Sequence, residues 1–205
     1  MTRKKQSKKA RLFIPSAALQ AIEQRYGEAA ATLARHLTVS DDRGGIESAV
    51  AVADQAARAL DGVVHTTDTD CPYFPIVLFG ANLLDDDQFF GACGIDPDDE
   101  VNVGGDDQPR LETFFGPQRK PVGEVYPTVQ LLTKLFDDYE WEHRDEYILE
   151  EERPRYDEAA KVLEDNGSVV GGILCGDDYI TRMVFVVSQC KKDVWAGVLT
   201  VLIET

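Results

Sequence analysis

Three apolar runs near the carboxyl end limit the folds open to this chain. Residues 168–175 (SVVGGILC), 179–188 (YITRMVFVVS) and 193–203 (DVWAGVLTVLI) are rich in β-branched side chains. Short polar linkers, 176–178 and 189–192, separate them. Apolar β-branched runs divided by short turn-forming segments are typical of strands joined by hairpins. The sequence therefore predicts three consecutive antiparallel strands.

The middle run predicts an interior strand of that sheet. Successive side chains of a strand point to opposite faces, and here both sets are apolar: Tyr179, Met183, Phe185 and Val187 on one face, Ile180, Val184 and Val186 on the other. Both faces must then be covered, and helices have to supply at least one cover.

Helical periodicity fills much of the chain before these runs. Apolar residues recur at helical spacing over 14–37, after Pro15, and again from Ile46 to Leu60, which predicts a helical hairpin. Further helices are predicted after Pro127 and after Pro154, and the last one ends at 166–167 (Asn-Gly).

Other segments carry strand and loop signals. Residues 63–64 and 74–79 are predicted to form short strands or irregular apolar structure around Pro72 and Pro75. Residues 85–112 are predicted to be surface loops because they hold ten acids and many turn formers. The predicted fold class is α+β, with N-terminal helices and a C-terminal antiparallel sheet flanked by helices. We expect residues 1–12 to form a basic disordered tail and residues 13–205 to form one domain.

Charge divides the chain into two unequal parts. The 205 residues carry a net charge of −16, and residues 1–12 hold six bases and no acid, which leaves −22 on the remainder. A body this acidic repels phosphate, so contact with nucleic acid is expected only through the tail, if at all. No apolar stretch is long enough to span a bilayer, and we expect no membrane partner. The four cysteines form no CxxC pair, which favours free thiols and the cytoplasm.

No motif indicates catalysis. The Gly-Asp-Asp at 176–178 resembles the metal-binding hairpin of polymerases, but a tight turn explains it more simply. The three histidines, His36, His65 and His143, lack metal-ligand spacing. Cys71 with His65, or Cys93, is a weak candidate for a nucleophile and base. Phosphate-binding loops, nucleophile elbows and dinucleotide fingerprints are missing. We therefore expect no catalytic residue, no metal ligand and no cofactor.

An acidic stretch is the best candidate for a binding site. Residues 137–165 hold thirteen acids against four Lys or Arg, with Trp141 and Tyr147 among them. One interpretation is a solvated helix face; the other is a docking patch that steers a basic protein and holds it through aromatic anchors. A nuclease would be such a partner, because carboxylates can replace phosphates in its substrate groove. The candidate partner-binding residues are Asp137, Asp138, Glu140, Trp141, Glu142, Asp145, Glu146, Tyr147, Glu150, Glu151 and Glu152.

Several motifs resemble the SUKH superfamily. The strand region from Gly171 to Gly197 is similar to that family's apolar strand ending in a Gly turn, a second apolar strand, and a Val-Trp pair, here at 173–176, 184–187 and 194–195. Residues 21–27 (AIEQRYG) look like its opening helix. The resemblance implies an α+β domain with a central sheet. It also implies protein binding, most often as an immunity protein that neutralises a bacterial toxin. We expect such a partner to be bound through the sheet and the acidic surface, without catalysis.

Two alternatives stay open. The chain would be a structural or assembly protein of phage or virus origin if its basic arm contacts nucleic acid or an acidic neighbour while the helical hairpin oligomerises. A hydrolase built on scattered carboxylates is the weaker alternative. An immunity-type protein is expected to be a monomer or a dimer.

Overall fold

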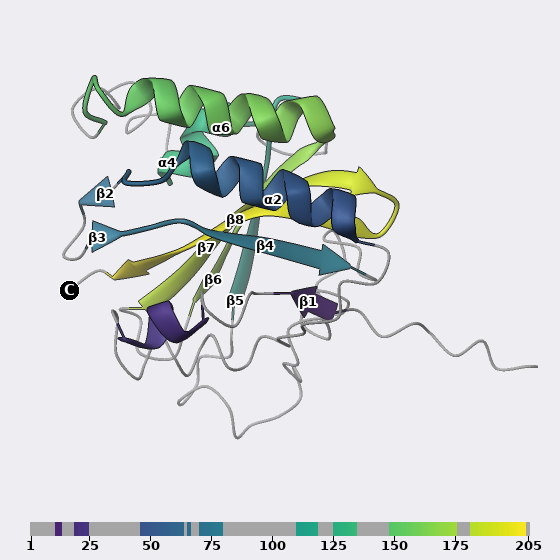
Figure 1. The fold of residues 1–205 in the computed structure, drawn as a ribbon, viewed down its shortest axis with the longest axis horizontal. Coiled ribbons are helices and arrows are strands. Elements are labelled where there is room, and N and C mark those ends of the chain that lie inside the picture. The colour runs from purple at the N-terminus through teal and green to yellow at the C-terminus, as the bar shows by residue number, and fades with distance from the viewer. Residues whose placement is uncertain are drawn as a thin grey trace, which may run out of the picture.

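The computed structural model describes residues 11–13, 19–24, 46–63, 65–66, 70–79, 110–118, 125–134, 148–175 and 181–203. Within these ranges the fold is α+β, as predicted (Figure 1). Its strands are β1 (Arg11–Phe13), β2 (His65–Thr66), β3 (Asp70–Cys71), β4 (Phe74–Phe79), β5 (Arg110–Phe115), β6 (Val169–Cys175), β7 (Thr181–Lys191) and β8 (Val194–Ile203). Its labelled helices are α2 (Glu47–Ala59), α4 (Thr128–Thr133) and α6 (Arg153–Asn166), and residues 19–24 are also helical.

The predicted C-terminal meander is confirmed. Strands β6, β7 and β8 pair antiparallel in sequence order, and Val186 of β7 lies opposite both Gly171 and Val198. Strand β7 is interior to the sheet, as its two apolar faces predicted. It continues to Lys191, through most of the predicted linker 189–192, because a bulge at the end of β7 lets pairing with β8 resume there.

The sheet extends beyond this meander on both sides. Its strand order within the described residues is β1-β4-β8-β7-β6-β5, and every pairing is antiparallel. Strand β4, predicted from its apolar residues, lies beside β8. The predicted C-terminal antiparallel sheet is thus present, and strands from earlier in the chain, β1, β4 and β5, add to it.

Two edge strands differ from the sequence expectation. Strand β5 begins at Arg110, inside the predicted loop 85–112, and β1 includes Arg11 and Leu12, which were assigned to the basic tail. Both strands are short and begin with an arginine, so their pairing depends on the neighbouring strand more than on their own pattern. Residues 1–10 and 80–109 lie outside the described residues.

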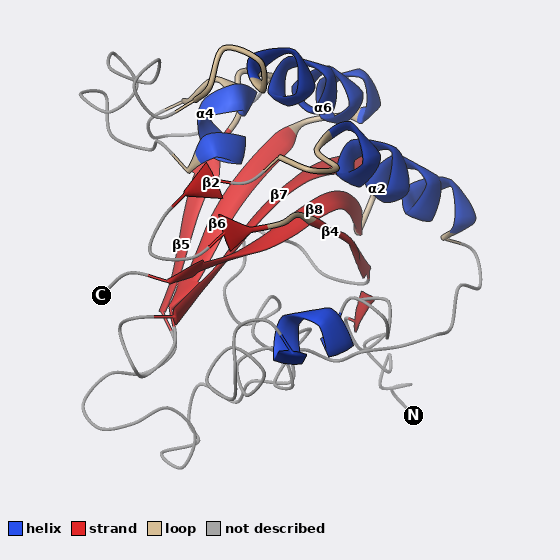
Figure 2. Ribbon diagram, turned by 60° about the vertical axis from the view of Figure 1, so that its left-hand side comes forward, coloured by secondary structure: helices blue, strands red, loops and turns tan. Residues whose placement is uncertain are grey.

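One face of the sheet is covered by α2, α4 and α6 (Figure 2). Val169, Val186 and Val198 of the sheet form a core with side chains of α4 and α6, including Leu131 and Leu163. Gly171 has no side chain to hold the helix away, and a Cβ added there would lie 3.1 Å from Cδ2 of Leu131. Helix α2 packs its small residues against β4 and β8, through Ala49, Ala53, Val77 and Ala196.

The opposite face is also buried. Met183, Phe185, Trp195 and Leu199 point to this side and are at most 5 % exposed. The Phe185 ring lies over Gly172, where an added Cβ would be only 2.0 Å from its Cζ. An aromatic ring covering a strand glycine in this way supplies packing that the glycine lacks. The prediction that β7 is covered on both faces is thus confirmed.

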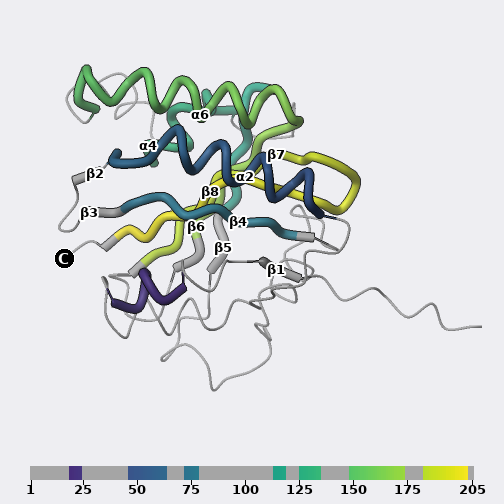
Figure 3. Tube along the Cα trace, viewed as in Figure 1, coloured from purple at the N-terminus to yellow at the C-terminus, as the bar shows by residue number. Residues whose placement is uncertain are grey.

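The predicted helical hairpin is not formed by the described residues. Residues 19–24 lie on the side of the sheet opposite α2, with Ile22 fully buried (Figures 2 and 3). Helix α2 instead packs its apolar side against β4 and β8. The rest of the predicted helix, 14–18 and 25–37, lies outside the described residues.

Helix α6 has well-defined ends. Pro154 occupies its first turn, as predicted, where a missing N–H costs nothing. At the other end the amide of Asn166 donates to the carbonyl of Val162, 2.7 Å away. Gly167 follows at φ +152°, and a Cβ there would lie 2.2 Å from the carbonyl oxygen of Gln189. This position accepts only glycine because the chain turns directly against β7.

Two tyrosines, Tyr73 and Tyr156, connect α6 with α4. The Tyr73 and Tyr156 rings meet edge to face with centroids 6.2 Å apart, and their hydroxyls share a hydrogen bond. Tyr73 also donates to the backbone carbonyl of Leu132 at the end of α4. Burial raises the pKa of Tyr156 to about 12, and the nearby Glu152 carboxylate adds to this increase.

We predict that this tyrosine makes the fold sensitive to alkali. Because the folded state holds the Tyr156 proton more tightly than the unfolded chain does, its contribution is full below about pH 10 and is lost as the pH rises through 12. The loss should be roughly 2 to 3 kcal/mol in the free energy of unfolding. Urea unfolding at pH 8 to 11.5 should show a steeper decline for the wild type than for Tyr156→Phe. Parallel pH profiles of the two proteins would contradict it.

Candidate binding surface

The outward side of the helical layer is acidic. Among residues 46–63 and 148–168, ten acidic and four basic residues lie on α2, α6 and their adjoining turns, and none of these fourteen is buried. The acids are Glu47, Asp54, Asp61, Glu150, Glu151, Glu152, Asp157, Glu158, Glu164 and Asp165. We call this the acidic layer. Its apolar side faces the sheet, so its charged side is left to solvent or to a partner.

The turn before α6 presents part of the predicted site. Glu150 and Glu151 are exposed and Glu152 is half-buried. The carbonyl of Leu149 accepts hydrogen bonds from the backbone N–H groups of Glu152 and Arg153, at 2.9 and 3.2 Å, which fixes this turn. Leu149 itself is 60 % exposed, although the preceding Ile148 is buried. The structure thus places three carboxylates and one apolar side chain together at the start of α6.

The other predicted site residues cannot be placed. Asp137, Asp138, Glu140, Trp141, Glu142, Asp145, Glu146 and Tyr147 lie outside the described residues. Their role as a docking patch stays a prediction.

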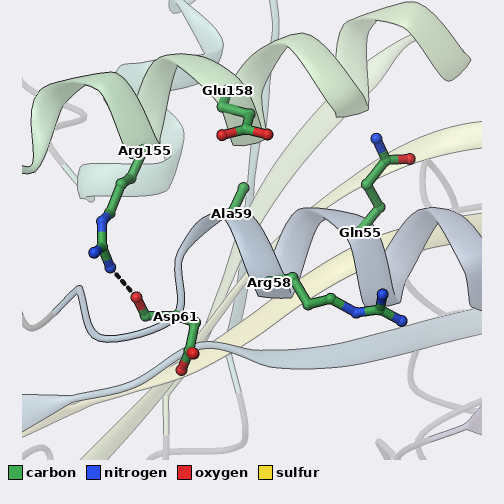
Figure 4. A pocket seen from close by; sticks show the side chains of 6 residues that line it. All are labelled: Gln55, Arg58, Ala59, Asp61, Arg155 and Glu158. Atoms are coloured by element: carbon green, nitrogen blue, oxygen red, sulfur yellow. Dashed lines mark hydrogen bonds between the residues drawn. The ribbon is translucent and has the colours of Figure 1, made fainter.

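A groove runs between α2 and α6 within the acidic layer (Figure 4). Its volume is about 400 Å³ and its lining residues are Gln55, Arg58, Ala59, Asp61, Arg155 and Glu158. The Arg155 guanidinium donates to the backbone carbonyl of Asp61, just after the last turn of α2. Gly62, at φ +75°, leaves room for this guanidinium, since an added Cβ would lie 3.3 Å from it. Arg155 therefore closes one end of the groove and joins the two helices.

The remaining polar side chains of the groove are available for contact. Within the described part of the chain, Gln55, Arg58 and Glu158 make no side-chain hydrogen bond or ion pair. Figure 4 shows that the Glu158 carboxylate points from α6 toward α2, while the Arg58 guanidinium points away from Glu158. This groove was not predicted from the sequence. On α2, Arg58 follows Gln55 by three positions, and on α6, Glu158 follows Arg155 by three positions. Only the packing of the two helices shows that both pairs face one groove.

Among the residues considered for catalysis, the structure describes the backbone of His65 and Cys71 and the side chain of Cys190. His65 and Cys71 are direct partners in the β2–β3 pairing. Cys190 is a free, half-buried thiol whose pKa is raised by burial. The segment 176–178, Cys93, His36 and His143 lie outside the described residues. Among the side chains that the structure does describe, no group of three or more His, Cys, Asp or Glu is arranged to hold a metal ion.

No family model matches the chain, and no curated protein matches it. In the described ranges, none of the helices has both the length and the apolar character needed to cross a membrane.

We predict that Arg155 contributes to stability while Arg58 does not. Arg155→Ala removes the hydrogen bond that joins α6 to the end of α2, which should lower the free energy of unfolding by about 1 kcal/mol. Arg58→Ala is the matched control from the same groove and should change it by less than about 0.5 kcal/mol. Urea unfolding at neutral pH measures both. Equal effects would show that the Arg155 contact adds nothing.

Proposed function

We propose that this protein is a non-catalytic binding domain that neutralises a basic protein toxin, in the manner of the SUKH immunity proteins that its strand motifs resemble. The observation that carries the proposal is the acidic layer, with ten acids against four bases on one side of the domain. A surface of one charge sign attracts a partner of the opposite sign over a long range and raises the association rate.

The acidic layer suits a nuclease partner in particular. Such an enzyme has a basic groove for phosphates, and carboxylates on a fixed frame can occupy it in their place. The turn at 149–152 offers three carboxylates beside the exposed Leu149, so charge and apolar contact are available at one spot. Interfaces combine these features when an anchor side chain sits within a polar rim.

The resemblance to SUKH domains supports the proposal of a binding scaffold built on the sheet. It does not indicate which surface of the protein contacts the partner. The described residues of its three strand motifs fall on β6, β7 and β8, which are neighbouring strands. Trp195 of the Val-Trp pair is 1 % exposed, so it packs the sheet and does not meet a partner. Because β7 and β8 are buried on both faces, we assign recognition to the exposed helical layer and not to the sheet surface expected from the sequence. An immunity protein of this type would act in the cytoplasm.

We predict that charge reversal at the turn before α6 slows association. The triple variant Glu150→Lys, Glu151→Lys and Glu152→Lys should reduce the association rate constant with an inhibited nuclease toxin by about tenfold or more at low salt. The difference should shrink at about 500 mM salt, where screening is strong. Surface plasmon resonance over a salt series measures it.

The control is a matched triple reversal elsewhere on the same layer. Glu47→Lys, Glu164→Lys and Asp165→Lys change the charge by the same amount, at α2's start and α6's end. If both triples slow binding equally, net charge acts and the turn has no special role. If neither does, the acidic layer is not the docking surface.

A further inference from the structure

We infer that the groove between α2 and α6 receives an arginine side chain of the partner protein. This inference rests on the proposed function and names the pocket within the acidic layer. The acceptor would be the Glu158 carboxylate, with the side-chain oxygen of Gln55 on the facing helix as a second acceptor.

The arrangement of the lining residues favours a cation. The groove holds two guanidiniums and two carboxylates, but the guanidiniums are not directed at Glu158. Arg155 is engaged by the carbonyl of Asp61, and Arg58 points away. Glu158 thus faces the groove and makes no ion pair with any residue that the structure describes. A carboxylate left in this state gains from an incoming positive group.

The surroundings of the groove favour the same charge. The acidic layer has six more acids than bases. Its acids include Asp157 and Asp54, which precede Glu158 and Gln55 in the sequence. A concave site within a field of one sign concentrates ions of the other sign. An anion entering between Arg58 and Arg155 would have to overcome this field.

The geometry also favours arginine over lysine. A guanidinium presents several N–H donors in one plane, so it can pair with a carboxylate through two bonds and still reach a second acceptor. The groove supplies acceptors from two helices, and its volume of about 400 Å³ accommodates a long side chain. A lysine ammonium is a more strongly hydrated point charge and gains less from such a fork.

A titration of the full chain with single amino-acid probes tests this inference. N-acetyl-arginine amide, added to ¹⁵N-labelled protein, should shift the amide signals of Gln55, Arg58 and Glu158 more than those elsewhere. Glu158→Gln keeps the size of the side chain and removes its charge, and it should weaken this binding about tenfold, which is 1.4 kcal/mol. Glu164→Gln, on the same helix but outside the groove, is the matched control and should leave the affinity unchanged.

Three results would overturn the inference. These are shifts that avoid the groove, equal affinity for wild type and Glu158→Gln, or a preference for N-acetyl-glutamate amide over the arginine probe. N-acetyl-lysine amide should bind more weakly than the arginine probe, and equal binding would contradict the argument for a guanidinium. These outcomes are separate from the proposed function. If the Lys triple slows toxin association while Glu158→Gln changes nothing, the acidic layer stands and the pocket does not.

Discussion

The burial of β7 on both faces is the constraint on which the rest of the structure depends. Val184 and Val186 face the helices, while Met183 and Phe185 face the opposite side, and all four are buried. A strand with two apolar faces cannot lie at a surface, so the sheet must be the middle layer of the domain. The glycines of β6 fit this role, since Gly171 admits Leu131 and Gly172 admits the Phe185 ring.

This middle layer determines where the charges lie. The helices that cover it use small residues such as Ala53 and Ala56 toward the core, which brings α2 close to β4 and β8 and leaves its polar side outward. Helix α6 lies beside α2 on the same face, and the polar sides of the two helices together form the acidic layer and its groove (Figure 1). A surface for another protein is thus built on elements whose apolar sides are already satisfied.

Much of the fold could be predicted from sequence because its signals are local. β-branched runs gave the meander, and Pro127, Pro154 and Gly167 marked helix ends through their backbone restrictions. The edge strands β1 and β5 were not predicted, because they are short and depend on β4 and β6 for pairing. The misplaced hairpin has a similar cause, since periodicity predicts an apolar face but not which side of a sheet it covers.

The candidate site was less predictable than the fold. The density of acids pointed to the turn at 150–152, where Glu150 and Glu151 are exposed and Glu152 is half-buried. Gln55 and Glu158 line the same groove because α2 and α6 pack together. The two residues are about a hundred positions apart in sequence, so no local pattern predicts this arrangement.

The most direct test is a titration of the protein against a panel of purified basic nuclease toxins, with nuclease activity as the readout. A non-catalytic binder should abolish the activity of its partner linearly, with the endpoint at one equivalent. Inhibition of no toxin in the panel, or complete inactivation by a small fraction of an equivalent, would contradict the account.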